Sequence, residues 1–227
     1  KRILAALLAA AMMLSLSVVG FAESTTETVS DLTGLTDAVK NSNITITLGK
    51  DITVSEPLVV SGTNVTIIGN GNTIKVENPN TFTQKSKNGS VITITGNGAR
   101  LVGVTVDGGG NVTTTASGLG RKYGIQVYGS SASATLKNVT VKNCGGWGAM
   151  LSNRGTLNTE GTLTLSGNGY GIEVSDGGSL NLGDTSLNIG SQPEPIIWVD
   201  ERTPTKMENI DVGSTGLELT TDESGNI

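Results

Sequence analysis

Residues 123–127 read Tyr-Gly-Ile-Gln-Val, and this pattern returns three times in the second half of the chain. The later copies are Trp-Gly-Ala-Met-Leu at 147–151, Tyr-Gly-Ile-Glu-Val at 170–174 and Pro-Ile-Ile-Trp-Val at 195–199, so their starts lie 24, 23 and 25 positions apart. Each copy leads to a second alternating run of apolar and polar residues. Apolar residues at every second position indicate strands with one apolar face, and the Gly, Asn, Ser and Asp between them indicate turns.

This repeat predicts a coiled chain in which each turn rests on the one before. One unit of short strands has too little apolar surface to form a core alone, whereas stacked units bury a continuous file of Ile, Val and Leu. We therefore expect an all-β, single-stranded right-handed parallel β-helix of about seven coils over residues 43–219, with neighbouring strands about 4.8 Å apart. The file predicted to lie inside contains Ile125, Ala149, Ile172 and Ile197.

The two ends of the chain carry different signals. Residues 1–22 combine a basic start, an apolar stretch and an exit of small residues, which predicts a secretory signal peptide and no stable membrane insertion after its cleavage. A membrane anchor is the alternative interpretation. Residues 23–42 form an N-terminal segment with a predicted short helix, which caps the first coil. Its apolar positions are Leu32, Leu35, Ala38 and Val39, and Ser30 or Asp31 is the expected N-cap.

The polar tail at 220–227 leaves three alternatives open. It folds over the last coil, or that coil is an edge open to a partner, or the chain continues beyond Ile227. The sequence does not decide among them, and it does not reveal the oligomeric state.

Composition restricts the chemistry that the chain can perform. The 227 residues include no histidine and a single cysteine, Cys144. The absence of histidine excludes His-dependent nucleophilic triads. A single cysteine excludes cysteine-based zinc sites and disulfide frameworks. The formal net charge of −5 argues against nucleic acid as a partner. We expect Cys144 to be a buried thiol inside an all-β repeat protein.

The coil pattern resembles the right-handed parallel β-helix family called the pectate lyase-like superfamily, and within it a secreted, adhesin-like member. The resemblance covers nearly all of the chain after residue 22 and implies the fold rather than one activity. Pectate lyases have a calcium-binding cluster of acids beside an arginine, and polygalacturonases have Asn-Thr-Asp, paired aspartates, Gly-His-Gly and Arg-Ile-Lys segments. None of these strings occurs in this chain, and only Arg154 or Arg202 beside Asp176 would allow a lyase-like arrangement.

The outward side chains of the first strand in each coil are the leading candidates for ligand contact. They include Gln126, Glu173 and Trp198, of which Trp198 offers an aromatic ring to a sugar. Coils 56–89 and 90–122 are longer than the others, and we expect their extra residues to form a basic wall beside this face. The wall contains Lys85, Lys87, Arg121 and Lys122. It suits an acidic or polyhydroxylated polymer, whereas the alternative is a solvated surface with solubilising charge.

A second group of aromatic residues lies at equivalent positions just before a glycine. Tyr123, Trp147 and Tyr170 are predicted to form a vertical stack. They stand an even number of positions before inward residues such as Ile125 and Val127, which places them on the same side of the strand. We therefore expect their rings to fill a corner of the core, with a ladder of sugar subsites as the alternative.

Charged residues after the first strand are the only catalytic candidates. Asp176 and Glu201 fall at equivalent positions in adjacent coils, about 5 Å apart by the strand spacing. Two such carboxylates, with Arg154 nearby, can flank a glycosidic bond or share a calcium ion, which is the only cofactor considered. A surface ion network with the arginines is the alternative.

Threonine pairs suggest one more function, ice binding. Flat Thr-x-Thr arrays are needed for it, and the pairs Thr45/Thr47, Thr93/Thr95 and Thr162/Thr164 have the spacing. They do not follow one another in consecutive coils of one face, so we do not favour ice binding.

The function expected from the sequence is that of a secreted or cell-surface, non-catalytic binding module. It would be adhesin-like and would contact a polysaccharide or cell-surface glycan through the first-strand face and the two long loops. The alternatives are a polysaccharide lyase or glycoside hydrolase of the same fold, and a structural stalk of a longer surface protein. The identity of the ligand and the presence of any catalysis stay open.

Overall fold

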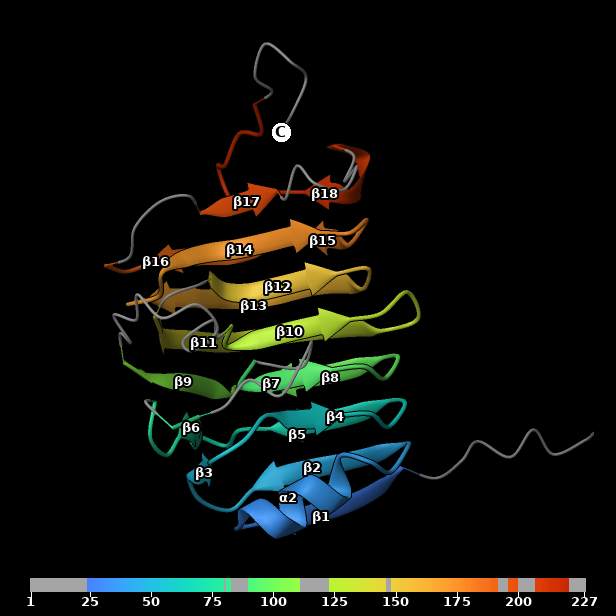
Figure 1. The fold of residues 1–227 in the computed structure, drawn as a ribbon. Helices are drawn as coiled ribbons and strands as arrows, with labels where there is room; N and C mark the ends of the chain where they lie inside the picture. The colour runs from blue at the N-terminus through green and yellow to red at the C-terminus, as the bar shows by residue number, and fades with distance from the viewer. Residues whose placement is uncertain are drawn as a thin grey trace, which may run out of the picture.

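The computed structural model winds the chain into a right-handed parallel β-helix. It describes residues 24–79, 81–82, 90–110, 123–145, 148–191, 196–199 and 207–220. In Figure 1 the strands nearest the viewer run to the right while the chain climbs from its N-terminal end, which makes the coil right-handed. The predicted fold class is thereby confirmed. The predicted signal peptide lies outside the described residues.

Three sheet faces surround the axis, and within them neighbouring strands pair in parallel. Face 1, toward the viewer in Figure 1, consists of β4 (Leu58–Val60), β7 (Ile92–Ile94), β10 (Ile125–Tyr128), β12 (Gly148–Asn153), β14 (Tyr170–Ser175) and β17 (Ile197–Val199). Face 2 consists of β1 (Thr25–Val29), β2 (Ile44–Leu48), β5 (Val65–Ile68), β8 (Ala99–Val102), β15 (Ser179–Asn181), β18 (Ile210–Asp211) and the first halves of β11 (Ser133–Cys144) and β13 (Thr156–Ser166). Face 3 consists of β3 (Ile52–Val54), β6 (Thr73–Val76), β9 (Thr105–Gly110), β16 (Ser186–Ile189) and the second halves of β11 and β13.

The core is the shared interior of the three faces. Alternate residues of the strands point inward and are almost fully excluded from solvent, as in β2, where Ile44, Ile46 and Leu48 are at most 3% exposed. Cys144 is also buried, as expected. Because successive coils place apolar side chains over one another, the interior is one continuous hydrophobic cluster.

One member of the predicted interior file is wrong. Met150, not Ala149, pairs with Ile125 below it and with Ile172 above it, and its side chain is 0% exposed. The predicted alignment of this coil is off by one residue, because Gly148, rather than Trp147, pairs with Tyr170. A shift of one residue exchanges the inward and outward sets of a strand.

The corner between faces 2 and 3 needs left-handed backbone. Asn138 has φ 54° and lies between the two halves of β11, where the pairing register with β13 shifts. Its Oδ1 accepts a hydrogen bond from the Thr162 amide of the next coil at 2.9 Å. Asparagine tolerates this conformation better than other residues with a side chain, so the Asn-rich turns follow from the bend that each coil makes.

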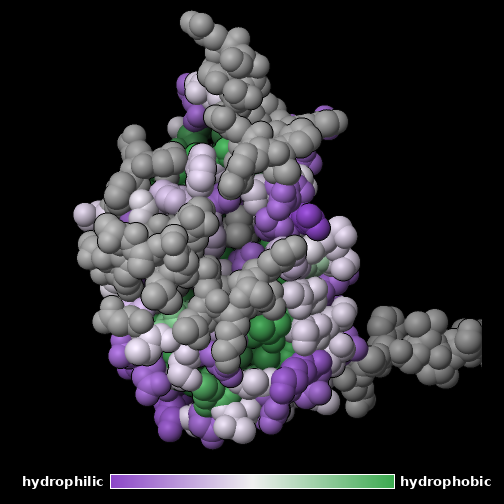
Figure 2. All heavy atoms as spheres, in the orientation of Figure 1, coloured by the Kyte–Doolittle hydropathy of each residue, from purple (hydrophilic) through white to green (hydrophobic). Residues whose placement is uncertain are grey.

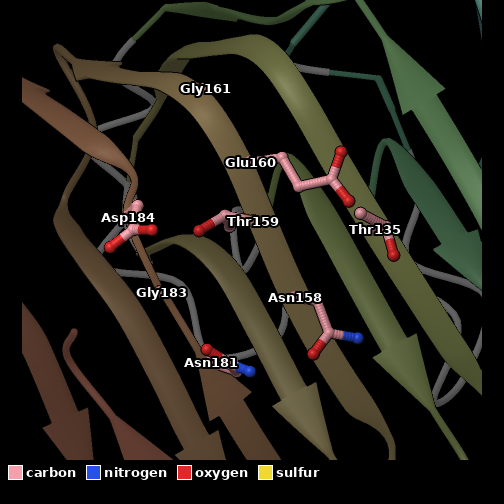
Figure 3. A pocket seen from close by; sticks show the side chains of 8 residues that line it. All are labelled: Thr135, Asn158, Thr159, Glu160, Gly161, Asn181, Gly183 and Asp184. Atoms are coloured by element: carbon pink, nitrogen blue, oxygen red, sulfur yellow. The ribbon is translucent and has the colours of Figure 1, made fainter.

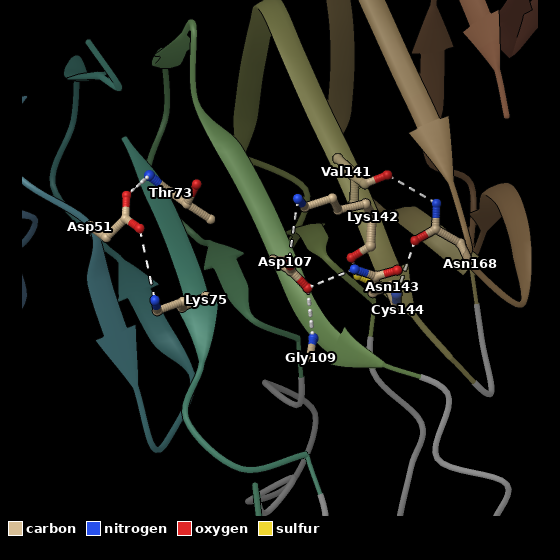
Figure 4. Close-up of polar contacts among 10 residues, drawn as sticks. All are labelled: Asp51, Thr73, Lys75, Asp107, Gly109, Val141, Lys142, Asn143, Cys144 and Asn168. Carbon is tan, nitrogen blue, oxygen red and sulfur yellow. Dashed lines mark hydrogen bonds and ion pairs between the residues drawn. The ribbon is translucent and has the colours of Figure 1, made fainter. Parts of the chain in front are cut away.

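Charged side chains alternate along the outer side of face 3. Lys75, Asp107 and Lys142 are register neighbours in three successive coils (Figure 4). Lys142 Nζ lies 3.5 Å from Asp107 Oδ2, and Lys75 Nζ lies 3.8 Å from Asp51 Oδ2. Exposed pairs of this kind contribute little free energy of folding, so they mainly keep this face hydrated.

Buried Asn168 closes the corner that follows face 3. Its amide nitrogen donates to the Val141 carbonyl, and its amide oxygen accepts from the Cys144 backbone N–H, both at 3.0 Å (Figure 4). Asn168 is 2% exposed, so its side chain satisfies two backbone groups that water cannot reach.

The predicted helix caps the first coil. Helix α2 (Leu32–Ala38) buries Leu35 and Ala38 against the core, and Asp31 is its N-cap, with its carboxylate accepting from the Gly34 amide at 2.8 Å. At the other end, the predicted β-helix does not extend as strand to residue 219, because residues 216–220 have no regular structure. Leu217 and Leu219 nevertheless pack partly against the core, after a 3-10 turn η2 (Met207–Asn209) and β18.

Replacing the N-cap is expected to loosen the N-terminal end. Asp31→Ala removes the acceptor for the Gly34 amide and should lower the free energy of unfolding by about 1 kcal/mol. For a chain of this length, thermal unfolding followed by circular dichroism should shift down by about 2–4 °C. Asp31→Asn keeps an acceptor and should be near wild type, as should Asp37→Ala, which removes only an exposed ion pair with Lys40. Equal melting temperatures for Asp31→Ala and Asp37→Ala would contradict this role.

None of the helices in the described ranges is long and apolar enough to cross a membrane.

Candidate functional site

The outward file of face 1 includes three buried polar residues. In register it contains Val59, Thr93, Gln126, Leu151, Glu173 and Trp198. Thr93, Gln126 and Glu173 are 0, 5 and 4% exposed, which is the burial of core residues, although they point away from the helix axis. Polar groups at such burial need partners, so this file is where polar interactions are most consequential.

Three of the residues on this side form a cluster of two tyrosines and one glutamate, named the tyrosine–glutamate cluster (Tyr123, Tyr170 and Glu173). Both tyrosine hydroxyls donate to Glu173 Oε2, the one from Tyr170 at 2.7 Å. The two hydroxyl oxygens are themselves 2.8 Å apart. Each hydroxyl carries one hydrogen. When the carboxylate is ionised, two hydrogens therefore serve three close oxygen–oxygen contacts: one between the hydroxyls and one from each hydroxyl to Glu173.

A glycine allows the two tyrosines to meet. They belong to coils on either side of β12, and their rings stand edge to face with centroids 6.3 Å apart. Gly148 occupies the register position of Tyr170 in the coil between them. A Cβ on Gly148 would lie 2.5 Å from Tyr170 Cε2, so only glycine leaves space for the ring.

The predicted stack of Tyr123, Trp147 and Tyr170 in a core corner is therefore incorrect for the two tyrosines. Their hydroxyls contact the outward Glu173, whose neighbours Ile172 and Val174 are the core residues of β14. Trp147 lies outside the described residues. The tyrosine rings and Glu173 thus belong to the outer side of face 1.

Trp198 extends the aromatic surface toward the C-terminal end. Its ring stands perpendicular to that of Tyr170, with centroids 5.3 Å apart. Both residues are only partly buried, so part of this aromatic pair is reachable from solvent. Trp198 also follows Glu173 in register, which places an aromatic surface directly beside the carboxylate.

The N-terminal half of the file has polar groups without aromatic residues. Ser90 Oγ donates to Gln126 Oε1 at 3.1 Å, and both residues are buried. Thr93 is the register neighbour of Gln126, and in the described part of the chain its buried hydroxyl has no hydrogen-bond partner. In Figure 2, which shows this side of the molecule, hydrophobic residues gather in its lower part between hydrophilic edges.

The turns after β12 and β14 carry the catalytic candidates that the structure describes. Asp176 Oδ2 accepts a hydrogen bond from Asn153 Nδ2 at 2.8 Å, and Asn153 also donates to Ser175 Oγ at 3.0 Å. Arg154 is exposed, has φ 62° and forms an isolated antiparallel bridge with Tyr128. These contacts hold the turn in place. Among the described residues of these turns there is no pair of carboxylates, and Glu201, the predicted partner of Asp176, lies outside them.

Lys85, Lys87, Arg121, Lys122, Glu201 and Arg202 lie outside the described residues. Within the described ranges there is no group of three or more His, Cys, Asp or Glu residues that could hold a metal ion. The threonine pairs lie on three different faces: Thr45 and Thr47 on face 2, Thr93 at face 1 and Thr164 on face 3.

The comparison with known proteins agrees with the fold. A family model described as "Putative pectate lyase-like adhesive domain" matches residues 26–164, more than half of the chain. The chain belongs to this family. The matched part of the adhesive domain includes Thr93, Gln126 and Tyr123 and ends before Tyr170, Glu173 and Trp198. Neither a curated protein nor a solved structure matches the chain.

Proposed function

We propose that this adhesive domain is a surface-exposed or secreted, non-catalytic module that binds carbohydrate through face 1. The family to which it belongs is one of adhesive domains, which supports a role in attachment outside the cell. The carbohydrate part of the proposal rests on one observation: the partly exposed pair of Tyr170 and Trp198 stands beside a carboxylate held by two hydroxyls.

The aromatic pair supplies the surface that a sugar ring needs. Sugar rings present apolar C–H groups on one side, and these pack on the faces of Trp and Tyr while the sugar hydroxyls stay near water. The perpendicular arrangement of the two rings gives a ligand two differently oriented apolar walls. In this proposal Trp198 is the principal contact.

The buried polar residues serve to position those rings. Glu173 is too buried to be an exposed anchor, but its carboxylate fixes the Tyr170 hydroxyl at 2.7 Å and thereby the angle of the ring. Rigid aromatic side chains lose little entropy on binding, which strengthens binding without added contacts. The basic residues Lys85, Lys87, Arg121 and Lys122 are proposed to extend the site toward acidic sugars.

A glycan array with the purified chain tests the proposal. Binding to one or more glycans is expected, and Trp198→Ala should weaken it by about thirtyfold, because an aromatic contact that becomes buried on binding contributes about 2 kcal/mol. Trp198→Phe keeps a ring and should retain most of the affinity. Thr140→Ala on face 3 should bind like wild type. Absence of binding to any glycan, or equal binding by Trp198→Ala, would remove the carbohydrate part of the proposal.

A further inference from the structure

We propose a second ligand site, on face 2, that takes a neutral, extended polysaccharide lying along the axis of the β-helix. The residues that carry it are Thr135, Asn158 and Asn181, with Glu160 and Asp184 at one side. The site lies on a different sheet from the Tyr170–Trp198 pair, so the inference does not depend on the function proposed for face 1.

The first observation is an unbroken polar file. One file of outward positions on face 2 runs in register through seven strands and contains Thr45, Thr66, Arg100, Thr135, Asn158, Asn181 and Asp211. Every member can donate or accept hydrogen bonds, and none is apolar. Such a file repeats its hydrogen-bonding groups once per coil, about every 4.8 Å.

The second observation is a depression over the C-terminal half of that file. It has a volume of about 440 Å³, and the side chains of Thr135, Asn158 and Asn181 line it from three successive coils (Figure 3). Gly161 and Gly183 also lie in its lining, at the corner between faces 2 and 3, and both have a positive φ. Below, the buried hydroxyls of Thr159 and Thr185 bond each other at 2.7 Å, so the floor is polar but satisfied.

The third observation is the charge of the lining. Glu160 and Asp184 contribute carboxylates, and the guanidinium of Arg100 lies 3.1 Å from Glu160 Oε2. Among the described residues, no lysine or arginine lines the depression, so an anionic polymer would meet the Asp184 carboxylate without a described lining cation to offset it. Carboxylates and amides are instead good partners for the hydroxyl groups of an uncharged sugar.

These features select the class of ligand. The described part of the lining has no aromatic or aliphatic side chain, and protein partners need such anchors in the centre of an interface. A calcium ion needs six to eight oxygen ligands, and no described group of three acids is present to supply them. An extended sugar chain, whose residues repeat at nearly the spacing of one coil, can place one ring over each of Thr135, Asn158 and Asn181.

Affinity electrophoresis in native gels tests the inference. The purified chain is run through hydroxyethylcellulose, a linear glucomannan, a linear β-1,4-galactan and, as an anionic polymer, polygalacturonate. At least one neutral polymer should retard it more strongly than polygalacturonate does. The variant Asn158→Ala/Asn181→Ala should bind that polymer about tenfold more weakly, since two hydrogen bonds are lost.

Matched variants separate the two faces. Thr140→Ala/Asn188→Ala removes two outward polar side chains from face 3 and should be retarded like wild type. Should the double variant melt at a lower temperature, Asn181→Ala alone, at an exposed position, should still weaken binding about threefold. The same gels are run in a Trp198→Ala background, which removes the principal contact proposed for face 1. In that background the inference is overturned if no neutral polymer retards the chain, if the Asn variants bind like the background protein, if polygalacturonate binds as tightly, or if a calcium chelator abolishes retardation.

Discussion

Met150→Ala is expected to destabilise the protein by about 3 kcal/mol, because truncating a fully buried long side chain loses its transfer free energy and leaves a cavity. The Met150 side chain is 0% exposed and lies between the register partners Ile125 and Ile172. For a domain of this size the midpoint of thermal unfolding should fall by about 6–12 °C, measured by circular dichroism or calorimetry.

A control from the same kind of strand makes the result specific. Ile68 is also an apolar strand residue, but it lies on the outer side of face 2 and is only partly buried. Ile68→Ala should therefore cost less than about 1 kcal/mol. If Met150→Ala were no more destabilising than Ile68→Ala, Met150 would not belong to the interior file, and β12 would pair with its neighbours in a different register.

The fold could be predicted from the sequence because the coil repeats a pattern whose physical cause is local. Alternation along a strand tells which residues share a side, and turn residues tell where the chain bends. The capping helix was predictable for the same reason, since Asp31 and the spacing of Leu35 and Ala38 are local signals that the structure confirms. Local patterns do not fix how one coil aligns with the next.

The error at Met150 shows where the alignment information is missing. The Trp-Gly and Tyr-Gly pairs at 147–148 and 170–171 look equivalent, yet Gly148 aligns with Tyr170. This register leaves the Tyr170 ring the space that it needs to reach across the Gly148 coil to Tyr123. That requirement involves three coils at once, so no spacing within one repeat reveals it.

The candidate sites were only partly predictable for a related reason. The alternation along each strand correctly assigned Gln126, Glu173 and Trp198 to one outward file. It does not tell whether an outward side chain is exposed to solvent or buried beneath other residues. The tyrosine hydroxyls were missed because parity placed their rings in the core. A signal was present: the fourth position of the Tyr-Gly-Ile-Xaa-Val repeat is Gln or Glu, and a polar residue beside repeated tyrosines suggests hydroxyl partners. The depression on face 2 brings together Thr135, Asn158 and Asn181 from three coils, and their juxtaposition is visible only once the coils are stacked.

Gly148→Ala is the second substitution with a large expected effect, because it tests how the tyrosine–glutamate cluster is assembled. The new Cβ would lie 2.5 Å from Tyr170 Cε2 and 2.7 Å from the Gly171 carbonyl oxygen. Either the ring or the backbone must move, so we expect a loss of about 1–3 kcal/mol in unfolding free energy. Displacing the ring also separates Tyr170 from Glu173 and from Trp198, so any glycan binding by face 1 should fall with stability.

A double-mutant cycle with Tyr170→Ala distinguishes a crowded ring from a general intolerance of side chains at position 148. If the ring is what Gly148 accommodates, Gly148→Ala should cost at least about 1 kcal/mol less once the ring is gone, measured by denaturant unfolding of all four proteins. Gly34→Ala is the matched control, since a Cβ there meets its nearest atom at an ordinary 3.4 Å, and helix propensity favours alanine. Additive effects of Gly148→Ala and Tyr170→Ala would mean that the clash is with the Gly171 carbonyl alone, and that the meeting of Tyr123 and Tyr170 has another cause.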